Sequence, residues 1–255
     1  MSVAAPPPSH RDGRPPHPTL SEYYRSPDER QAVVDGLFDD SAQYYDWICR
    51  VMSAGTGSSY RREVLKRAGL RPGMMLLDVA TGTGLVAREA IAVLGDPRRL
   101  VALDPSAGML RECRKVAPGR LVRGVGEALP FADGRFEMLT MGYALRHVPD
   151  LEQAFREYHR VLKPGGRLVV MEIVRPRSRL GVFALRVLLK HVLPLVTRVG
   201  TRSARAERLM RYYWETVAHC VAPEAILEAL RRAGFERVER RSSGPVLSEY
   251  LGSRP

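Results

Sequence analysis

The chain has 255 residues, 45 % of them hydrophobic, so it can bury the core of one large α/β domain or of two small ones. Its three cysteines (Cys49, Cys113 and Cys220) lie far apart without CxxC spacing, and its histidines show no paired-ligand spacing; neither a disulfide framework nor a metal site is predicted. The formal net charge of +12 comes almost entirely from arginine and does not by itself indicate a nucleic-acid partner.

The first 20 residues contain six prolines and few large apolar residues, so we expect a disordered arm. No basic stretch followed by an apolar run opens the chain, which argues against a secretory signal and predicts a cytoplasmic protein. From residue 21 to residue 60, apolar residues recur at spacings of three and four, which predicts a helical lead-in. We expect residues 21–255 to form a single domain.

After the lead-in, apolar runs of strand length alternate with helix-length segments, and this alternation predicts βαβ units in a parallel sheet. The sequence KPGG at residues 163–166 is expected to end a helix before the fifth strand. Seven strands are expected, near residues 74–79, 100–103, 121–124, 138–142, 167–173, 235–241 and 246–251.

A long helical stretch, residues 180–222, interrupts the alternation after the fifth strand. Its first part, residues 180–199, contains too many charges to span a bilayer, yet it is more apolar than a surface helix needs to be. We expect an insertion at about residues 178–222 that forms a lid, with its apolar side walling the active site and its arginines pointing outward. An ordinary core helix or a homodimer interface is the alternative.

Basic residues are concentrated in the same part of the chain. Residues 174–211 contain ten basic residues and one acidic residue. This concentration is typical of a solvated surface, but it also fits peripheral contact with an anionic membrane, to which each lysine or arginine adds about 1 kcal/mol of attraction.

The segment MMLLDVATGTGLVAREA, residues 74–90, is the most informative: a strand, an acidic residue, a turn of small residues and a helix. Gly82 and Gly84 allow a sharp turn and close approach of a ligand to the helix N-terminus. Together with Ala87 they also match the dinucleotide fingerprint, so NAD is an alternative. Asp78 lies at the approach to the turn, where its charge would repel a pyrophosphate and attract a cationic ligand.

S-Adenosylmethionine suits such a turn because it carries a sulfonium and an ammonium group and no phosphate. Asp78 is expected to face the ammonium group, and Asp104, at the end of the second strand, to accept both ribose hydroxyls. The alternative is that Asp104 caps the helix that follows it, because Pro105 comes next. Met109, one helical turn further on, is expected to pack against the adenine or within the core.

Several segments together resemble the class I S-adenosylmethionine-dependent methyltransferases, specifically the ubiquinone/menaquinone biosynthesis C-methyltransferases. The resemblance runs from about residue 34 to residue 252. It implies a Rossmann-like, doubly wound α/β fold with a mostly parallel seven-stranded sheet, an antiparallel C-terminal strand and helical cap elements. It also implies cofactor contacts from Ala80, Pro105, Gly126 and Glu127. The matching segments are DVATGTG, VALDPSAGML, GEALPFADGRFE, YALRHVPD, RVLKPGGRLVVMEIVRP, AGFERV, FDDSAQYYD and RYYWETV.

Three departures from the family pattern lie near the expected substrate. Val125 stands where the family usually has an Asp or Asn that holds the adenine amino group, so backbone groups must make that contact or it is lost. The family's Arg-Asn pair after the fourth strand is Arg146-His147 here, and the C-terminal GPVLSEYLGSRP differs from the usual ending.

The predicted reaction is methylation at a carbon atom of a hydroxylated aromatic or quinone-like molecule. Removal of a phenolic proton raises the electron density at the ortho carbon, so a base is expected near that hydroxyl. Arg146 is expected to stabilise the phenolate and His147 to accept the proton, although His147 can equally begin a helix and pack on the sheet. Tyr45 is expected to close over the site or to serve as a core aromatic residue.

Three other functions are weighed against this prediction. Oxygen methylation of a phenolic natural product is the nearest alternative. Methylation of nucleic acid is disfavoured because the loop after the fourth strand, MGYALRHVPD, lacks the Asn/Asp-Pro-Pro-aromatic cluster that holds a planar amine. A binding protein without catalysis is disfavoured by the intact acidic residues and glycines.

Overall fold

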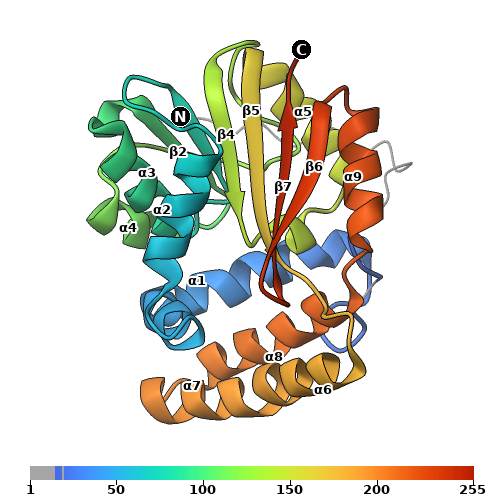
Figure 1. Ribbon diagram of the computed structural model, residues 1–255. Coiled ribbons are helices and arrows are strands. Elements are labelled where there is room, and N and C mark those ends of the chain that lie inside the picture. The colour runs from blue at the N-terminus through green and yellow to red at the C-terminus, as the bar shows by residue number, and fades with distance from the viewer. Residues whose placement is uncertain (1–14, 19) are drawn as a thin grey trace.

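The computed structural model describes residues 15–18 and 20–255, which form one seven-stranded sheet with helices on both faces (Figure 1). The strand order is β3-β2-β1-β4-β5-β7-β6, and β7 alone runs antiparallel to its neighbours. The predicted Rossmann-like fold with an antiparallel C-terminal strand is confirmed. The strands are β1 (Leu76–Val79), β2 (Leu100–Asp104), β3 (Arg120–Arg123), β4 (Phe136–Gly142), β5 (Leu162–Ile173), β6 (Glu236–Ser243) and β7 (Leu247–Ser253).

A hydrophobic core lies on each face of the sheet. Helices α2, α3 and α4 pack on one face, and α5 and α9 pack on the other. The central strands β1 and β2 are buried along their whole length, as expected for parallel strands covered on both faces. The helices are α2 (Gly57–Arg67), α3 (Leu85–Leu94), α4 (Ala107–Val116), α5 (Leu151–Val161) and α9 (Pro223–Arg232).

The parallel register brings the ends of β1, β2 and β4 to one edge of the sheet. Val79 in β1 is paired with Leu103 in β2 and with Met141 in β4, so the residues that follow these three strands meet there. The first helix, α1 (Pro27–Met52), crosses below this edge in the view of Figure 1. Ligands of open α/β sheets bind at the carboxyl ends of the strands, so this edge is the expected site.

The KPGG segment differs from the prediction. Helix α5 ends at Val161, as expected, but β5 begins at Leu162 and includes all four KPGG residues. The reason is the C-terminus of the chain, because the Gly165 amide donates to the Arg254 carbonyl and the Arg254 amide donates to the Gly166 carbonyl, both at 2.9 Å. These bonds extend the strand through residues that would otherwise form a turn.

Part of the N-terminal arm is ordered, which corrects the prediction of disorder for residues 1–20. Pro16, His17 and Leu20 are buried. The Pro16 carbonyl accepts a 2.7 Å hydrogen bond from the Val221 amide, and the His17 ring lies 3.1 Å from the guanidinium of Arg30 in α1. The prediction for residues 1–14 and 19 falls outside the described residues.

The predicted helical stretch after β5 is divided in two. A continuous helix of 23 residues, Arg179–Thr201, consists of α6 (Arg179–Val187), one π-helical turn (Leu188–Val192) and α7 (Leu193–Thr201). Arg202 then takes a left-handed conformation with φ 53°, and α8 (Ala204–His219) runs back against α7 and α1. By length and composition alone, the 23-residue helix is apolar enough to cross a membrane.

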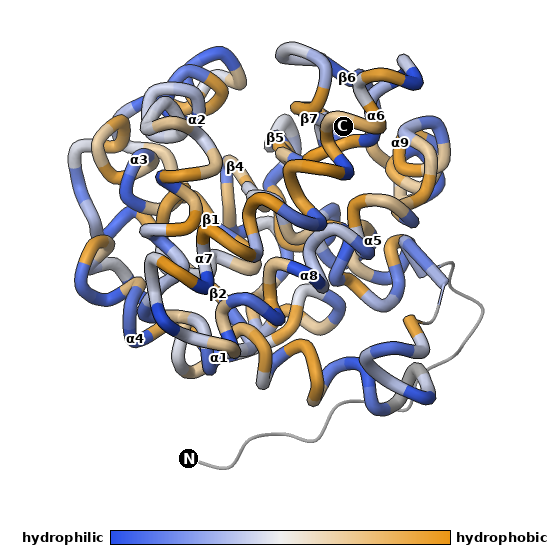
Figure 2. Tube along the Cα trace, turned by 90° about the horizontal axis from the view of Figure 1, so that it is seen from below, coloured by the Kyte–Doolittle hydropathy of each residue, from blue (hydrophilic) through white to orange (hydrophobic). Residues whose placement is uncertain are grey.

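This 23-residue helix turns much of its apolar surface to solvent. Phe183 is 63 % exposed and Leu195 is 64 % exposed, whereas only a narrow stripe that includes Leu189 and Leu193 is buried against α1 and α8. In the view from below, hydrophobic residues recur along this helix (Figure 2). The exposed apolar residues are Leu180, Phe183, Leu188, Val192, Leu195, Val196 and Val199, and we call them the outer apolar face.

Candidate functional site

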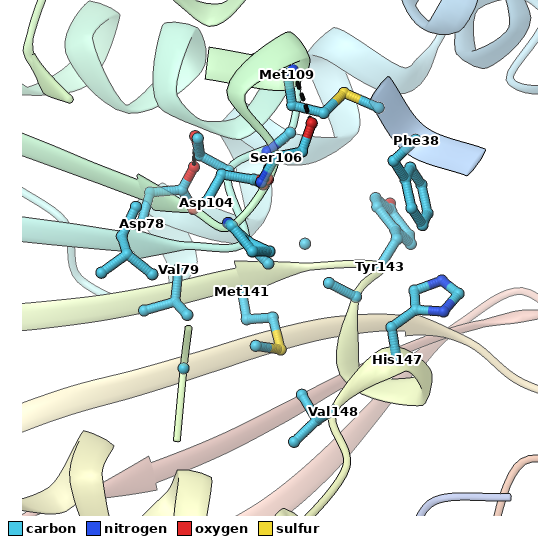
Figure 3. A pocket seen from close by; sticks show the side chains of 18 of the residues that line it. Phe38, Asp78, Val79, Asp104, Ser106, Met109, Met141, Tyr143, His147 and Val148 are labelled. Atoms are coloured by element: carbon cyan, nitrogen blue, oxygen red, sulfur yellow. Dashed lines mark hydrogen bonds between the residues drawn. The ribbon is translucent and has the colours of Figure 1, made fainter. Parts of the chain in front are cut away.

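The main cavity lies at the carboxyl edge of the sheet, between the strand ends and α1 (Figure 3). It contains about 1040 Å³ of empty space, part of it open to solvent. Its walls come from α1, from the turn after β1, and from the residues that follow β2, β3 and β4.

The turn after β1 has the backbone that the sequence predicts. Gly82 and Gly84 have φ of 57° and 85°, and Ala80 also takes a left-handed conformation with φ 51°. A Cβ on Gly82 would meet no atom within 4 Å, so this glycine leaves room for a ligand. Gly84 does not line the cavity: it precedes the first residue of α3, and a Cβ there would lie 2.8 Å from Cys113 Sγ.

The two predicted acidic residues line the cavity, and their neighbours hold both of them in place. Asp78 accepts hydrogen bonds from the hydroxyls of Thr81 at 2.6 Å and Thr140 at 2.7 Å. Asp104 accepts from the backbone amides of Gly82 at 2.8 Å and Ser106 at 2.9 Å. Each carboxylate oxygen therefore has one protein donor and a lone pair left for a ligand.

Asp104 does not cap α4 directly, although the sequence suggested this alternative. Ser106 is the N-cap of that helix, and its hydroxyl accepts from the Met109 amide at 3.0 Å. Asp39 of α1 adds a second cap, because its Oδ1 accepts from the Gly108 amide at 2.7 Å and from the Ser106 hydroxyl. Asp104 instead fixes the turn after β1 to the end of β2.

Three carboxyls in the cavity wall titrate near neutral pH. Burial raises the pKa of Asp78 to about 6, that of Asp104 to about 7 and that of Glu127 to about 7, and the hydrogen bonds to each group offset only part of this effect. A ligand that supplies positive charge and hydroxyl donors relieves the cost of ionising these groups. A pyrophosphate would increase that cost, so the residues fit S-adenosylmethionine better than NAD.

The structure brings the other predicted cofactor residues to the same cavity. Ala80, Pro105, Met109 and Gly126 line it together with Glu127. Val125, at the position of the missing Asp or Asn, also lines the wall. The contacts of these residues with a cofactor remain predictions.

His147 and Tyr45, two of the three predicted catalytic residues, line the cavity. Burial, then the positive charge of Arg146, lowers the pKa of His147 well below its usual 6.5, so its imidazole is neutral at physiological pH. Its Nδ1 lies 3.4 Å from the Tyr212 hydroxyl, and its buried Nε2 has no partner among the described residues. Burial also raises the pKa of Tyr45 well above its usual value, which keeps the phenol protonated.

Arg146, the third predicted catalytic residue, does not line the cavity, which corrects its expected role as a phenolate contact. Its guanidinium is fully buried and pairs with Glu172 at 2.6 Å, and it lies 4.0 Å from the centre of the Tyr213 ring. The same Nη1 donates to the Tyr143 carbonyl at 2.7 Å. Arg146 thus anchors the segment that carries Tyr143 and His147, and it does so without lining the cavity itself.

The expected lid does not wall the cavity either. None of the residues 180–199 lines it, and the outer apolar face points away from it. Helix α1 occupies the position predicted for the lid: Val34, Phe38 and Tyr45 line the cavity from that helix, and α8 packs against α1. The long helix therefore forms a further layer below α1 and α8 (Figure 1).

Sequence reasoning missed several wall residues that belong to no cofactor motif, among them Phe38, Tyr143 and Arg61. Phe38 packs edge-on against His147 with ring centroids 5.2 Å apart. Tyr143 follows β4 in a left-handed conformation with φ 60°, and Arg61 comes from α2. Phe38 had a signal, because it begins the FDDSAQYYD segment, whereas nothing in the local sequence distinguished Arg61 from its neighbours.

The buried ion pair gives a stability prediction. Because removal of one partner leaves an uncompensated buried charge, Glu172→Gln is expected to lower the free energy of unfolding by about 3 kcal/mol, and Arg146→Met by a similar amount. Urea unfolding measures both, with the exposed Arg175→Met as the control. An unfolding free energy of Arg146→Met equal to that of the unmodified protein would contradict the structural role of the ion pair.

Comparison with known proteins agrees with this geometry. A model of the ubiE/COQ5 methyltransferase family matches residues 25–252. The demethylmenaquinone methyltransferase of Symbiobacterium thermophilum is 34 % identical over 219 residues, which cover 82 % of this chain and 87 % of that protein. The ubiquinone/menaquinone biosynthesis C-methyltransferase UbiE of Pseudomonas paraeruginosa is 31 % identical over 255 residues, which cover 96 % and 98 %.

Solved structures share the fold at lower identity. A SAM-dependent methyltransferase from Aquifex aeolicus is 15 % identical with a TM-score of 0.58, covering 91 % of this chain and all of that one. The Haemonchus contortus phosphoethanolamine N-methyltransferase 2, in complex with S-adenosyl-L-methionine, is 16 % identical with a TM-score of 0.60, covering 89 % and 59 %. The family match extends over most of the chain, which therefore belongs to the ubiE/COQ5 family and is an S-adenosylmethionine-dependent methyltransferase.

Proposed function

We propose that this enzyme methylates a ring carbon of a hydroxylated, quinone-like aromatic molecule. This proposal rests on the observation that one cavity has two walls of different chemistry. The acidic residues and the glycine turn form one wall, and the aromatic side chains of Phe38, Tyr45, Tyr143 and His147 form the other. The names of the relatives, demethylmenaquinone methyltransferase and ubiquinone/menaquinone biosynthesis C-methyltransferase, support a substrate of this class.

Bound S-adenosylmethionine supplies an electrophilic methyl group on its sulfonium. The protein contributes orientation and exclusion of water, since in-line displacement requires alignment of the nucleophile with the methyl group. Asp104 accepts from the ribose, and the aromatic wall packs a planar ring against the cofactor. Neutral His147 accepts a hydrogen bond from the ring hydroxyl at Nε2, and the phenol of Tyr45 donates one.

The low pKa of His147 limits what this residue does. A neutral imidazole that resists protonation is a weak general base, so His147 polarises and orients the hydroxyl, and a water molecule carries the proton away. An acidic hydroxyquinone, which is already ionised at neutral pH, needs no strong base. The low basicity of the site therefore favours acidic phenols over simple ones.

The test is incubation of the purified enzyme with methyl-deuterated S-adenosylmethionine and a panel of hydroxynaphthoquinones and simple phenols. We expect the label on a ring carbon of the acidic hydroxyquinones, identified by mass spectrometry and NMR. A methyl ether as the only product would assign oxygen methylation instead. Labelled RNA with no labelled aromatic compound would overturn the proposal.

The raised pKa values predict that cofactor binding depends on pH. The ionised carboxyls favour the cationic ligand, so binding lowers their pKa and releases protons near pH 7, and affinity rises from about pH 6 to about pH 8. Calorimetry in two buffers of different ionisation enthalpy measures the released protons. Asp104→Asn is expected to weaken binding by about 1 to 3 kcal/mol and to reduce the proton release. Exposed Glu228→Gln is the control, and equal proton release in all three proteins would refute the assignment.

We further propose that the outer apolar face rests on an anionic membrane. Arginines precede the long helix, lie within it and follow it, and Arg175, Arg177, Arg179, Arg186, Arg202 and Arg208 have no carboxylate partner among the described residues. Exposed apolar side chains together with unpaired arginines match the interface of an anionic bilayer, where both kinds of group find partners. A second copy of this chain would carry the same positive charge and would be repelled.

Vesicle flotation tests the membrane proposal. We expect binding to anionic but not to neutral vesicles, weakened by salt and by Phe183→Ser/Leu195→Ser, because each of these side chains buries apolar surface worth about 2 kcal/mol. Arg231→Ser on α9 is the control for a surface change elsewhere. Equal behaviour toward both vesicle types, or dimerisation through this face in light scattering without lipid, would contradict the proposal.

A further inference from the structure

Arg61 is a buried cation at the boundary of two cavities. It comes from α2, is only 8 % exposed, and lines both the main cavity and a second, adjoining one. The second cavity lies between the end of α1 and the starts of α2 and α3, and its walls include Asp46, Arg50, Gly57 and Arg88. The carbon at the centre of the Arg61 guanidinium lies 5.6 Å from the centroid of the Tyr143 ring.

The guanidinium of Arg61 lacks a polar partner. It makes no hydrogen bond and no ion pair within residues 15–18 and 20–255, and its buried Nε has no acceptor. Arg146 differs, because that buried guanidinium has a carboxylate, a hydroxyl and a carbonyl as partners, and only its Nη2 lacks one among the described residues. An uncompensated buried cation costs several kcal/mol, so this arrangement indicates an anionic ligand.

The surroundings keep this guanidinium in place for a ligand. Gly57, one turn earlier in α2, has no side chain, and a Cβ there would lie 2.7 Å from Arg61 Nη1. The positive charge of Arg61 also acts on Asp78, one of the acidic residues in the wall of the main cavity. Burial is the main influence on the pKa of Asp78, and the positive charge of Arg61 is among the effects that oppose it.

An amino-acid moiety needs one acidic and one basic partner close together, because its ammonium and carboxylate share a carbon atom. Asp78 supplies the negative partner, and Arg61 is the cation whose charge opposes the rise that burial causes in the pKa of the Asp78 carboxyl. The Thr83 hydroxyl donates to Asp46, which ties the glycine turn to the helix beside Arg61. Asp78 and Arg61 therefore bring opposite charges to the same cavity.

We propose that Arg61 binds the α-carboxylate of the methionine half of S-adenosylmethionine. The inference rests on the cofactor orientation proposed above, with the ribose at Asp104 and the ammonium toward Asp78. An anionic oxygen of the substrate is the other source of the same chemistry. The cofactor is favoured because the second cavity, which Arg61 also lines, carries the charged side chains of Asp46, Arg50 and Arg88, which do not suit a planar apolar ring.

Calorimetry with two matched ligands tests this assignment without any measurement of turnover. S-Adenosylmethionine and its decarboxylated form share the adenosine, the sulfonium and the amine, and they differ only in the carboxylate. Arg61→Met is expected to weaken binding of S-adenosylmethionine roughly 10- to 100-fold, as for loss of a charge-assisted hydrogen bond. Binding of the decarboxylated ligand is expected to change by less than about threefold, because this ligand offers nothing to the guanidinium.

Two further variants complete the experiment. Arg61→Lys keeps the charge and is expected to retain part of the preference for the carboxylate. Lys66→Met removes one positive charge from an exposed position of the same helix and is expected to bind both ligands as the unmodified enzyme does.

Each of the other possible outcomes would overturn the proposal for a different reason. Equal loss of both ligands in Arg61→Met would show a structural role and overturn the proposal. Unchanged cofactor affinity with a raised KM for the aromatic substrate would overturn it in favour of a substrate anion. If the unmodified enzyme bound neither ligand, the proposed cofactor orientation would fail together with this inference.

Discussion

The burial of carboxyl groups at one edge of the sheet is the constraint on which the site depends. The register of β1 and β2 pairs Asp78 with Ala102, so Asp78 and Asp104 lie on neighbouring strands, two residues apart in register, in a medium that penalises their ionisation. Two threonine hydroxyls and two backbone amides offset part of this cost, and two of these donors, the Thr81 hydroxyl and the Gly82 amide, come from the turn after β1, where Ala80 and Gly82 adopt left-handed backbone conformations. The glycine turn is therefore needed to hold the acids as well as to admit a ligand.

The sequence predicted this part of the molecule well because its determinants are local. A strand, an acid and a glycine turn lie within about ten residues, and the edge at which they meet follows from the parallel alternation of strands and helices. Eight of the nine predicted cofactor residues line one cavity, and the ninth, Gly84, begins the adjoining helix. Seven strands were expected and seven are present, with β5 longer than predicted because the C-terminus pairs with KPGG.

The remaining features depend on contacts between residues far apart in sequence. A helix with apolar residues on several sides does not reveal which side packs, so the orientation of residues 180–199 was predicted wrongly. Arg146 appeared catalytic because its motif follows β4, whereas its role is set by Glu172 on the next strand of the sheet. Arg61 is distinguished by its lack of a hydrogen-bond or ion-pair partner among the described residues. A local sequence pattern does not show which side chains remain without such a partner.

Helix α1 joins these separate parts into one unit. Its carboxylates fasten it to the cofactor loops, since Asp39 holds the N-terminus of α4 and Asp46 accepts from Thr83 in the glycine turn. The same helix carries Phe38 and Tyr45 into the cavity and packs against α8. The aromatic wall is thus held in a fixed position relative to the acidic wall. The long outer helix packs against both α8 and α1, and none of its residues lines the cavity, so a displacement of that helix acts on the cavity through its neighbours and not by direct contact.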